Sequence, residues 1–369
     1  YWLALCKWKK VSDQAALNEL NDLLGKARSR SIKAKCHLSL SELAKELKDH
    51  DMALYHLKSA AKLTTERSEK GLIYGRLAEM AFNKEDYEMA QEGYSNVIAN
   101  SLSKEKIEKA HLQILKILRE NKDYRSAQKK IKGMLTDEKL KRISGNLELE
   151  LVQLYRAQGN SSEIETRLES IVNNYQRTQV SAEAYYQLGQ IYTSEKWDLT
   201  KAKEYFDNVS KESSRSLFSP MAKSHSKSIT TYQNAKKDID RHINMNDATE
   251  AINLAKEQDT TNSLQMSVSV EKAPQRSLPE LYYQLADLEA FSFKRYIQSK
   301  DLLYKIINEY PESDFKPKAM FALVFVYESL ADTNSALLTK EKLLDEFPGT
   351  DYASYISDDE VKVEIQKGN

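Results

Sequence analysis

A fixed spacing of 37 residues constrains the fold of this chain more than any other feature of the sequence. Large apolar residues recur at this interval at Leu3, Leu40, Leu77, Ile114, Leu151 and Leu188. Two further rows keep the same spacing: Ala16, Ala53, Ala90, Ala127 and Ile164, and then Leu20, Leu57, Tyr94, Ile131 and Leu168. A period of about 20 to 50 residues is typical of stacked structural repeats. The sequence therefore predicts a solenoid in which each unit packs against its neighbours.

The composition indicates that the repeated units are helical. The 369 residues include only 6 Pro and 10 Gly, and 30% of them are charged. Apolar and charged residues alternate along the chain in the way that amphipathic helices require. Lys and Arg total 55, Asp and Glu also total 55, and the formal net charge is zero. The basic surface expected of a nucleic-acid-binding protein is therefore not predicted.

The longest apolar run, residues 319–327, is far shorter than the ~20 residues that span a membrane. No transmembrane segment is therefore expected. Val324 and Val326 would suit a strand, but the register of Tyr327 and Ala336 favours a helix. Because this helix would be apolar on all sides, we expect it to be buried between neighbours.

The small and large positions of each unit resemble the tetratricopeptide repeat (TPR). The first helix follows L-[AGS]-x-x-[AYL], as at Leu77-Ala78, and the second follows A-x-x-x-[LYF]-x-x-[AVI], as at Ala90. The unit is three residues longer than the family's 34, and the family's closing Pro is missing from the first six units. The resemblance implies an all-α fold, a right-handed α-solenoid of about eight helix-turn-helix units. It also implies non-catalytic binding of proteins or peptides.

The register divides the chain into four parts. Six repeats are predicted in 1–212, an irregular helical segment and connector in 213–278, a pair of repeats in 279–357 and a charged tail in 358–369. Within the second part, Ser219-Pro220 should begin a polar helix over 221–242, followed by a weaker helix over 248–257. Residues 259–279 are rich in Ser, Thr, Asn and Gln and are predicted to form a flexible connector.

Turn residues mark the bend inside each unit. Asp49, Asp86 and Asp123 are spaced by 37 residues and suit the N-cap of each second helix. Gly159 suits the left-handed residue that ends a first helix. In the sixth unit one extra residue, near Trp197, moves the alanine row to Ala202.

The last two units carry a Pro link that resembles bacterial envelope TPR lipoproteins. Tyr310-Pro311-Glu312-Ser313 and Phe347-Pro348-Gly349-Thr350 follow the pattern [YF]-P-x-[ST]. That group includes the lipoprotein subunit of outer-membrane β-barrel assembly and secretion accessory lipoproteins. The resemblance implies a scaffold or adaptor in a bacterial envelope assembly or secretion system, periplasmic or associated with the outer membrane. The alternatives are a cytoplasmic adaptor and an accessory repeat domain of a larger enzyme.

The first residue is Tyr1 rather than Met, and Leu3 already lies in mid-repeat. We therefore expect the sequence to be a fragment, which leaves room for a lipid anchor upstream.

The sequence contains no motif for an enzyme, cofactor or metal site. There is no glycine-rich phosphate loop, H-E-x-x-H or C-x-x-C. His50 and His56 are six residues apart and should face different sides of a helix, and each histidine is expected to be a surface or packing residue. Cys6 and Cys36 are expected to be buried and too far apart for a disulfide. We predict a protein that is not an enzyme and that uses no cofactor.

Resemblance to the TPR family also suggests where a partner binds. In that family certain first-helix positions line the concave face, and here they hold Lys109, Lys116, Arg119, Gln153, Arg156, Tyr186 and Gln190. Basic and amide side chains predominate, so one hypothesis is a groove for an acidic or carboxylate-bearing peptide. The alternative is a solvated inner face. Lys116, Arg119 and Arg156 are expected to be exposed. The family's clamp for chaperone C-termini is not matched, because Leu38 and Glu42 occupy its first positions.

Overall fold

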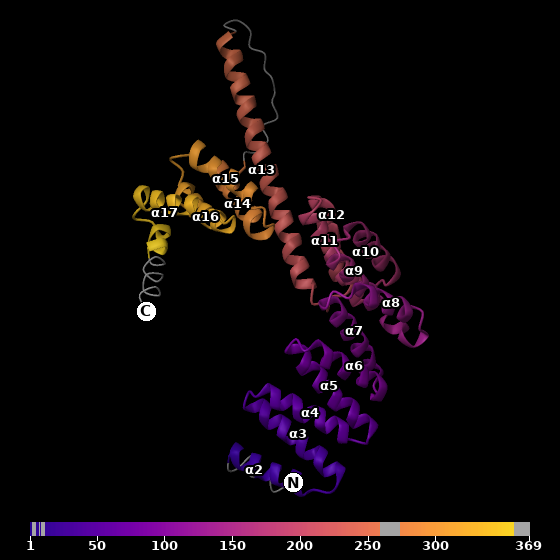
Figure 1. Cartoon of the computed structure of the whole chain (residues 1–369). Helices are drawn as coiled ribbons and strands as arrows, with labels where there is room; N and C mark the ends of the chain where they lie inside the picture. Colours follow the sequence, from indigo (N-terminus) through magenta and orange to yellow (C-terminus); the bar gives the residue numbers. More distant parts are fainter. Residues whose placement is uncertain (2–4, 7, 9–11, 259–273, 358–369) are drawn as a thin grey trace. The chain divides into compact units, whose positions relative to one another are not determined.

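The computed structural model describes residues 1, 5–6, 8, 12–258 and 274–357, and these residues form helices and connecting turns with no strand (Figure 1). The chain divides into two compact units, Tyr1–Gln176 and Arg177–Asn369. They are called the first and the second unit below. The predicted all-α fold of repeated helix-turn-helix units is confirmed in both.

The first unit is a series of helix pairs joined by short turns. Its elements are α2 (Asp13–Lys26), α3 (Arg30–Glu46), α4 (His50–Leu63), α5 (Arg67–Asn83), α6 (Tyr87–Asn100), α7 (Lys104–Glu120), α8 (Tyr124–Leu135), the 3₁₀ helix η1 (Glu138–Ile143), α9 (Ser144–Ala157) and α10 (Ser161–Asn174). The helices of α3/α4, α5/α6, α7/α8 and α9/α10 pack against each other within each pair.

The second unit contains the sixth repeat, a long helix and the last two repeats. Its elements are α11 (Gln179–Ser194), α12 (Leu199–Glu212), α13 (Ser219–Gln258), α14 (Leu278–Asp287), the π-helical turn η2 (Leu288–Ser292), α15 (Tyr296–Glu309), α16 (Phe315–Ser329) and α17 (Thr333–Glu346). A last helical segment covers 351–357. No helix in the described part of the chain is long and apolar enough to cross a membrane.

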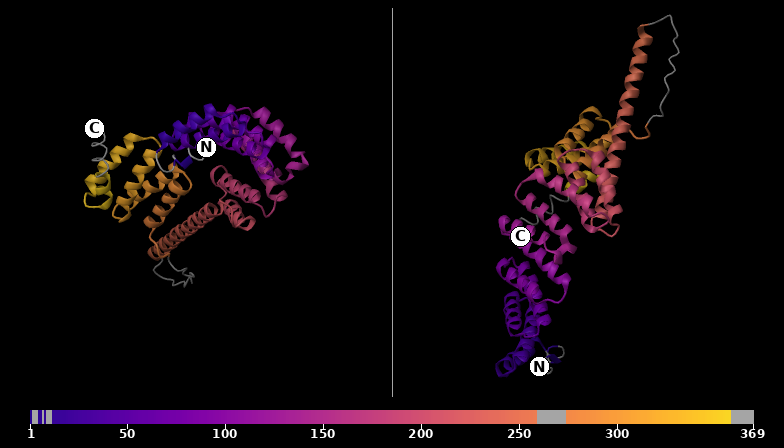
Figure 2. Two further views of the ribbon diagram at one scale, coloured as in Figure 1. Left: turned by 90° about the horizontal axis from the view of Figure 1, so that it is seen from below. Right: turned by 90° about the vertical axis from the view of Figure 1, so that its right-hand side faces the viewer.

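The long helix α13 corrects one prediction. Two helices were expected, over 221–242 and 248–257, but α13 runs continuously for 40 residues. Residues 243–247 contain neither Gly nor Pro, so nothing there interrupts the backbone hydrogen bonds of the helix. One end of α13 extends well past the helices that pack against it in the same unit (Figure 2). Residues 259–273 of the predicted connector lie outside the described part.

The rows that repeat every 37 residues form the core. Leu40, Leu77, Ile114, Leu151 and Leu188 are each 5% exposed or less. The described members of the other two rows are buried as well, from Ala16 to Ile164 and from Leu20 to Leu168. At one crossing, a Cβ atom on Gly93 would lie 2.8 Å from that of Ala78. Small side chains therefore let α5 and α6 approach closely, as the pattern predicts.

The turn inside each pair repeats with the same period. Lys48, Glu85, Lys122 and Gly159 are 37 residues apart and have left-handed φ angles of 58° to 71°. The N–H of the next residue then donates to a carbonyl five positions back, as from Asp49 to Ala44 at 2.8 Å. The Asp49 side chain also accepts from the N–H of Met52 at 3.0 Å. One residue thus closes the first helix and caps the second, which confirms the predicted caps.

The two cysteines differ in environment. Both are free, as expected, and Cys36 is buried in the core. Cys6 is exposed, so the prediction that it is buried is wrong.

Candidate functional site

Five of the predicted concave-face residues lie in the first unit, on α7 and α9, and contact neighbouring helices. They are called the basic row below: Lys109, Lys116, Arg119, Gln153 and Arg156. Lys109 Nζ lies 3.1 Å from Glu79 Oε1 of α5. Arg119 Nη1 lies 2.6 Å from Glu150 Oε2 of α9. Lys116 Nζ lies 4.9 Å from the centre of the Phe82 ring. The two ion pairs therefore neutralise part of the charge of Lys109 and Arg119.

The exposure of this row differs from the prediction. The Arg119 side chain is only 19% exposed, and Lys116 is half-buried. The expected exposure of Arg119 is therefore wrong, because the ion pair with Glu150 draws it between α7 and α9. Burial raises the pKa of the Glu150 carboxyl and Arg119 opposes that rise. Arg156 is exposed, as expected, and Gln153 is half-buried.

The other two predicted residues, Tyr186 and Gln190, lie on α11 in the second unit. Tyr186 is 7% exposed and stacks on Phe218, with ring centres 5.0 Å apart. It packs under the start of α13 instead of facing solvent. Gln190 is exposed, and its Nε2 donates to the Tyr186 hydroxyl at 3.4 Å. The seven residues are thus divided between the two compact units, and their binding role stays a prediction.

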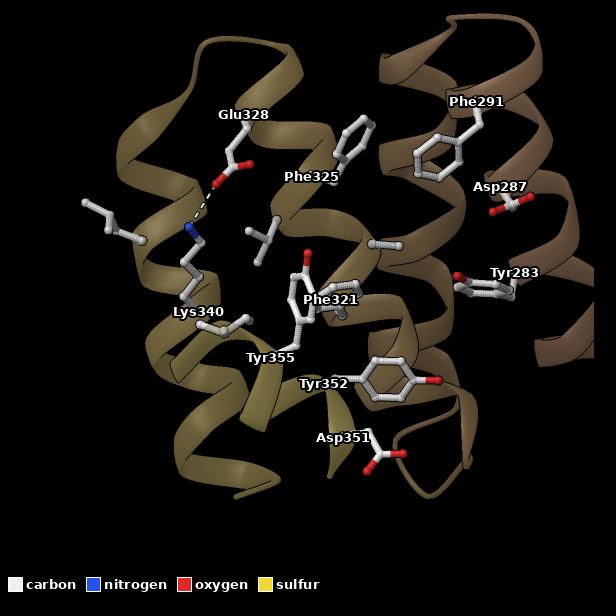
Figure 3. Close-up of a pocket in the computed structure, with 14 residues that line it drawn as sticks. Tyr283, Asp287, Phe291, Phe321, Phe325, Glu328, Lys340, Asp351, Tyr352 and Tyr355 are labelled. Carbon is white, nitrogen blue, oxygen red and sulfur yellow. Dashed lines mark hydrogen bonds and ion pairs between the residues drawn. The ribbon is translucent and has the colours of Figure 1, made fainter. Parts of the chain in front are cut away.

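A more open apolar surface is found in the second unit. Four segments, α14 with η2, α16, α17 and 351–357, enclose a pocket of about 970 Å³ (Figure 3). This volume is in the range of ligand-binding pockets. Most of its lining is aromatic or aliphatic, with four charged side chains.

The two main walls come from first helices of the last two repeats. Tyr283, Asp287 and Phe291 are spaced by four residues, so they lie along one face of α14 and η2. On α16, Phe321 and Phe325 are also four residues apart. The Phe291 and Phe325 rings stack with centres 4.7 Å apart, yet remain 46% and 39% exposed. Large aromatic side chains are therefore open to solvent inside a concave surface.

The remaining walls complete the pocket. The Tyr352 and Tyr355 rings, from the last helical segment, lie 5.5 Å and 5.8 Å from the ring of Phe321. On α17, Lys340 Nζ lies 2.8 Å from Glu328 Oε1, as the dashed line in Figure 3 shows. The lining is therefore mainly aromatic, with a few charged side chains among the rings.

Carboxylates outnumber cations on the pocket lining. Asp287, Glu328 and Asp351 carry negative charge, whereas Lys340 is the single cation among the described lining residues. Burial raises the pKa of Asp287, and the charge of Lys318 opposes that rise. Burial, followed by the nearby Asp287 carboxylate, raises the pKa of Tyr283 to about 12, so its hydroxyl stays protonated near neutral pH.

The family positions that selected the basic row also identify this pocket. Lys116 was chosen because it follows Ile114 by two residues. The same rule places Asp287 after Leu285 and Phe325 after Leu323 in the last two repeats. The sequence-based selection of concave-face residues stopped at Gln190 and did not include these two positions. It also expected the apolar helix over 319–327 to be buried all round, which is wrong for Phe325 because that face of α16 lines the pocket.

A buried histidine pair in the first unit was also missed. His37 Nδ1 and His56 Nδ1 lie 2.8 Å apart, between α3 and α4. One nitrogen must donate and the other accept, so the hydrogen bond requires at least one neutral ring. Burial, together with the charge on His37, lowers the pKa of His56 to about 4. The same offset of 19 residues joins Arg167 to Glu148 at 3.3 Å, so it marks facing positions within a repeat.

No protein-family model and no curated protein sequence matches the chain. Several solved structures resemble it at low identity. The apo form of the quorum sensor NprR from B. thuringiensis is 14% identical, with a TM-score of 0.40, covering 93% of this chain and 95% of that one. The C-terminal part of a TPR repeat-containing protein from Cytophaga hutchinsonii is 12% identical, with a TM-score of 0.38, covering 87% and 98%. Pseudomonas aeruginosa pilF is 11% identical, with a TM-score of 0.33, covering 79% and 99%.

Proposed function

We propose that this chain is a non-catalytic protein-interaction scaffold that binds apolar segments of other proteins in the aromatic pocket of the second unit. The observation that carries the proposal is the exposure of Phe291 and Phe325 inside that pocket. Exposing aromatic rings to water is unfavourable, and a partner that covers them recovers the free energy of burial. Concave aromatic surfaces with a few polar groups are typical of binding sites.

The chemistry of the lining favours binding over catalysis. Its polar groups are three carboxylates, one ammonium and tyrosine hydroxyls. The one described ion pair within the lining joins Glu328 to Lys340 at 2.8 Å. Such groups can orient a bound segment, while the rings supply most of the contact area.

The basic row of the first unit is a weaker candidate for a binding surface than the aromatic pocket. Lys109 and Arg119 already bind Glu79 and Glu150, so an acidic peptide would have to displace these carboxylates. An acidic ligand at α7 and α9 remains a hypothesis, in which the exposed side chains of Lys109 and Arg156 would be the accessible cations.

We further propose that the scaffold acts in a bacterial cell envelope, in assembly or secretion. The support is the pair of Pro links at 310–313 and 347–350, before α16 and after α17. A cytoplasmic adaptor and an accessory domain of a larger enzyme are the alternatives. Fractionation of the native organism with an antibody against this chain tests the location, and recovery in the soluble cytoplasmic fraction would exclude the envelope.

A peptide-display selection on the immobilised chain tests the pocket directly. Selected peptides are synthesised with a fluorescent label and titrated by anisotropy. We expect the double variant Phe291→Ala/Phe325→Ala to lose at least about tenfold in affinity, the equivalent of 1.4 kcal/mol. The matched control is Ile297→Ala, an exposed apolar residue of α15 outside the pocket. Equal affinity for the double variant and wild type, or failure to select any peptide, would refute the pocket as the binding site.

A further inference from the structure

The charge around the pocket is unbalanced. Lys340 is engaged by Glu328 at 2.8 Å, which leaves Asp287 and Asp351 as the negative side chains without a cation among the described lining residues. Lys318, outside the lining, is the cation whose charge acts on Asp287. The Lys318 ammonium lies over the Tyr283 ring, 4.4 Å from its centre. The pocket therefore presents an excess of carboxylate next to an apolar floor.

Asp287 lies between two aromatic rings on the same wall. Tyr283 precedes it by one helical turn and Phe291 follows it by one, and all three face the pocket (Figure 3). A carboxylate next to an aromatic ring can pair with a guanidinium or ammonium group while the ring stabilises the same cation by cation–π contact. Lys318 already lies over the Tyr283 ring, so Phe291 is the ring beside Asp287 that would make this contact. Asp287 is exposed in the chain alone. A bound segment that covers it would exclude water and so strengthen such a charge-assisted pair.

We propose that the pocket selects segments in which an aromatic or large aliphatic side chain lies next to an arginine or lysine. The apolar side chain packs among Phe321, Phe325 and Tyr355, and the cation pairs with Asp287. This inference rests on the proposed binding function and adds the chemistry of the partner to it. The partner is thus a basic, apolar peptide segment of another protein, unlike the acidic ligand expected at the basic row.

Charge also argues against the chain's own C-terminal residues as the occupant. The sequence after Ser357 carries four acidic residues, Asp358, Asp359, Glu360 and Glu364, against two lysines, Lys362 and Lys367. A net negative segment would be repelled by Asp287 and Asp351. A basic segment gains from both, so charge complementarity favours a separate partner.

The test begins with the displayed peptides that bind the wild-type chain. We expect Arg or Lys to be enriched beside an apolar residue, and replacing that Arg by its neutral isostere citrulline should weaken binding about tenfold. Asp287→Asn should weaken the Arg peptide by a similar factor and leave the citrulline peptide unchanged. The matched control is Asp301→Asn, an exposed aspartate of α15 outside the pocket. Asp287→Lys should reverse the preference, so that a Glu peptide binds better than the Arg peptide.

The outcomes separate this inference from the proposed function. If peptides bind through Phe291 and Phe325 but Arg and citrulline versions bind equally, the charge preference is refuted and the pocket stands. If Asp287→Asn and Asp301→Asn have the same effect, Asp287 does not supply the preference. Circular dichroism melting of each variant confirms that it is folded. A titration repeated at high salt should narrow the difference between Arg and citrulline, because salt screens partly exposed charge pairs.

Discussion

The inner positions of first helices serve different purposes in the two units. In the first unit, Lys109 and Arg119 extend to carboxylates on the adjacent repeats and bind them. In the second unit, Phe291 and Phe325 stack on each other and remain exposed in a pocket. All four residues lie on the first helices of their repeats, but the side chains that they contact differ. An inner position of a first helix can therefore join neighbouring repeats or line an open pocket, and the side chains around it decide which.

Charge joins repeats throughout the first unit. Arg76 binds Glu42 at 2.8 Å, and Lys58 binds Glu92 at 3.2 Å, both across an offset of 34 residues. Arg142 binds Glu108 across the same offset. Most of these pairs are solvent-exposed and individually weak. The pair of Arg119 and Glu150 is more buried, so substituting Arg119 tests whether such pairs stabilise the first unit.

The largest expected effect is on the free energy of unfolding, and it should distinguish two residues of α16 that are two positions apart. Leu323 is 2% exposed and Phe325 is 39% exposed. Leu323→Ala should lower the free energy of unfolding by about 2 to 5 kcal/mol, because it leaves a cavity in the core. Phe325→Ala should cost about 1 kcal/mol or less, because much of the ring is already in water. Urea unfolding followed by circular dichroism measures both, and equal losses would mean that Phe325 is a core residue and not a pocket residue.

Next in size is an effect of pH on the first unit. The pKa of His56 is about 4 in the folded chain, below its ordinary value of 6.5. Between these values the unfolded state binds more protons, so the free energy of unfolding should fall as pH drops from 6.5 towards 4. The double variant His37→Leu/His56→Phe should lose part of this dependence. The control His50→Gln changes an exposed histidine and should retain it. Parallel pH profiles for all three proteins would contradict the neutral buried pair.

A charge reversal at Arg119 should have a smaller effect on stability. Arg119→Glu places a second carboxylate beside Glu150 in a partly buried contact. We expect a loss of about 2 kcal/mol, since hydrogen bonds to charged groups contribute at this level. Arg156→Glu changes an exposed side chain and serves as the control. Denaturation midpoints that shift equally for both variants would show that the ion pair does not stabilise the first unit.

The smallest effect is expected at Lys109, whose side chain is 62% exposed. Lys109→Glu should change stability by less than about 1 kcal/mol, because exposed ion pairs are screened by water and salt. If Lys109→Glu lowers the melting temperature more than Arg119→Glu does, the exposed ion pair stabilises the first unit more than the buried one, contrary to this prediction.

The local sequence determined the architecture, because the apolar spacing and the capping residues act within a single repeat. The 37-residue rows predict which residues are buried, from Leu40 to Leu188. The aspartates predict the caps, and the left-handed residue falls one position before each cap. The break expected in α13 was wrong, since the polar stretch over 243–247 lacks any residue that ends a helix. The exposure of Phe325 was missed because an apolar side chain has the same pattern in a core and in a pocket.

The sequence by itself thus determined the period, the helices and their buried faces, because backbone hydrogen bonding and burial follow from residues close in the chain. The tertiary structure decided what the inward-facing side chains meet. Glu150 pairs with Arg119, His37 bonds to His56 across 19 residues, and Phe291 stacks on Phe325 in the pocket. These pairings depend on the angle and distance between packed helices. Such geometry is set by the sum of many contacts, and no single motif in the sequence records it.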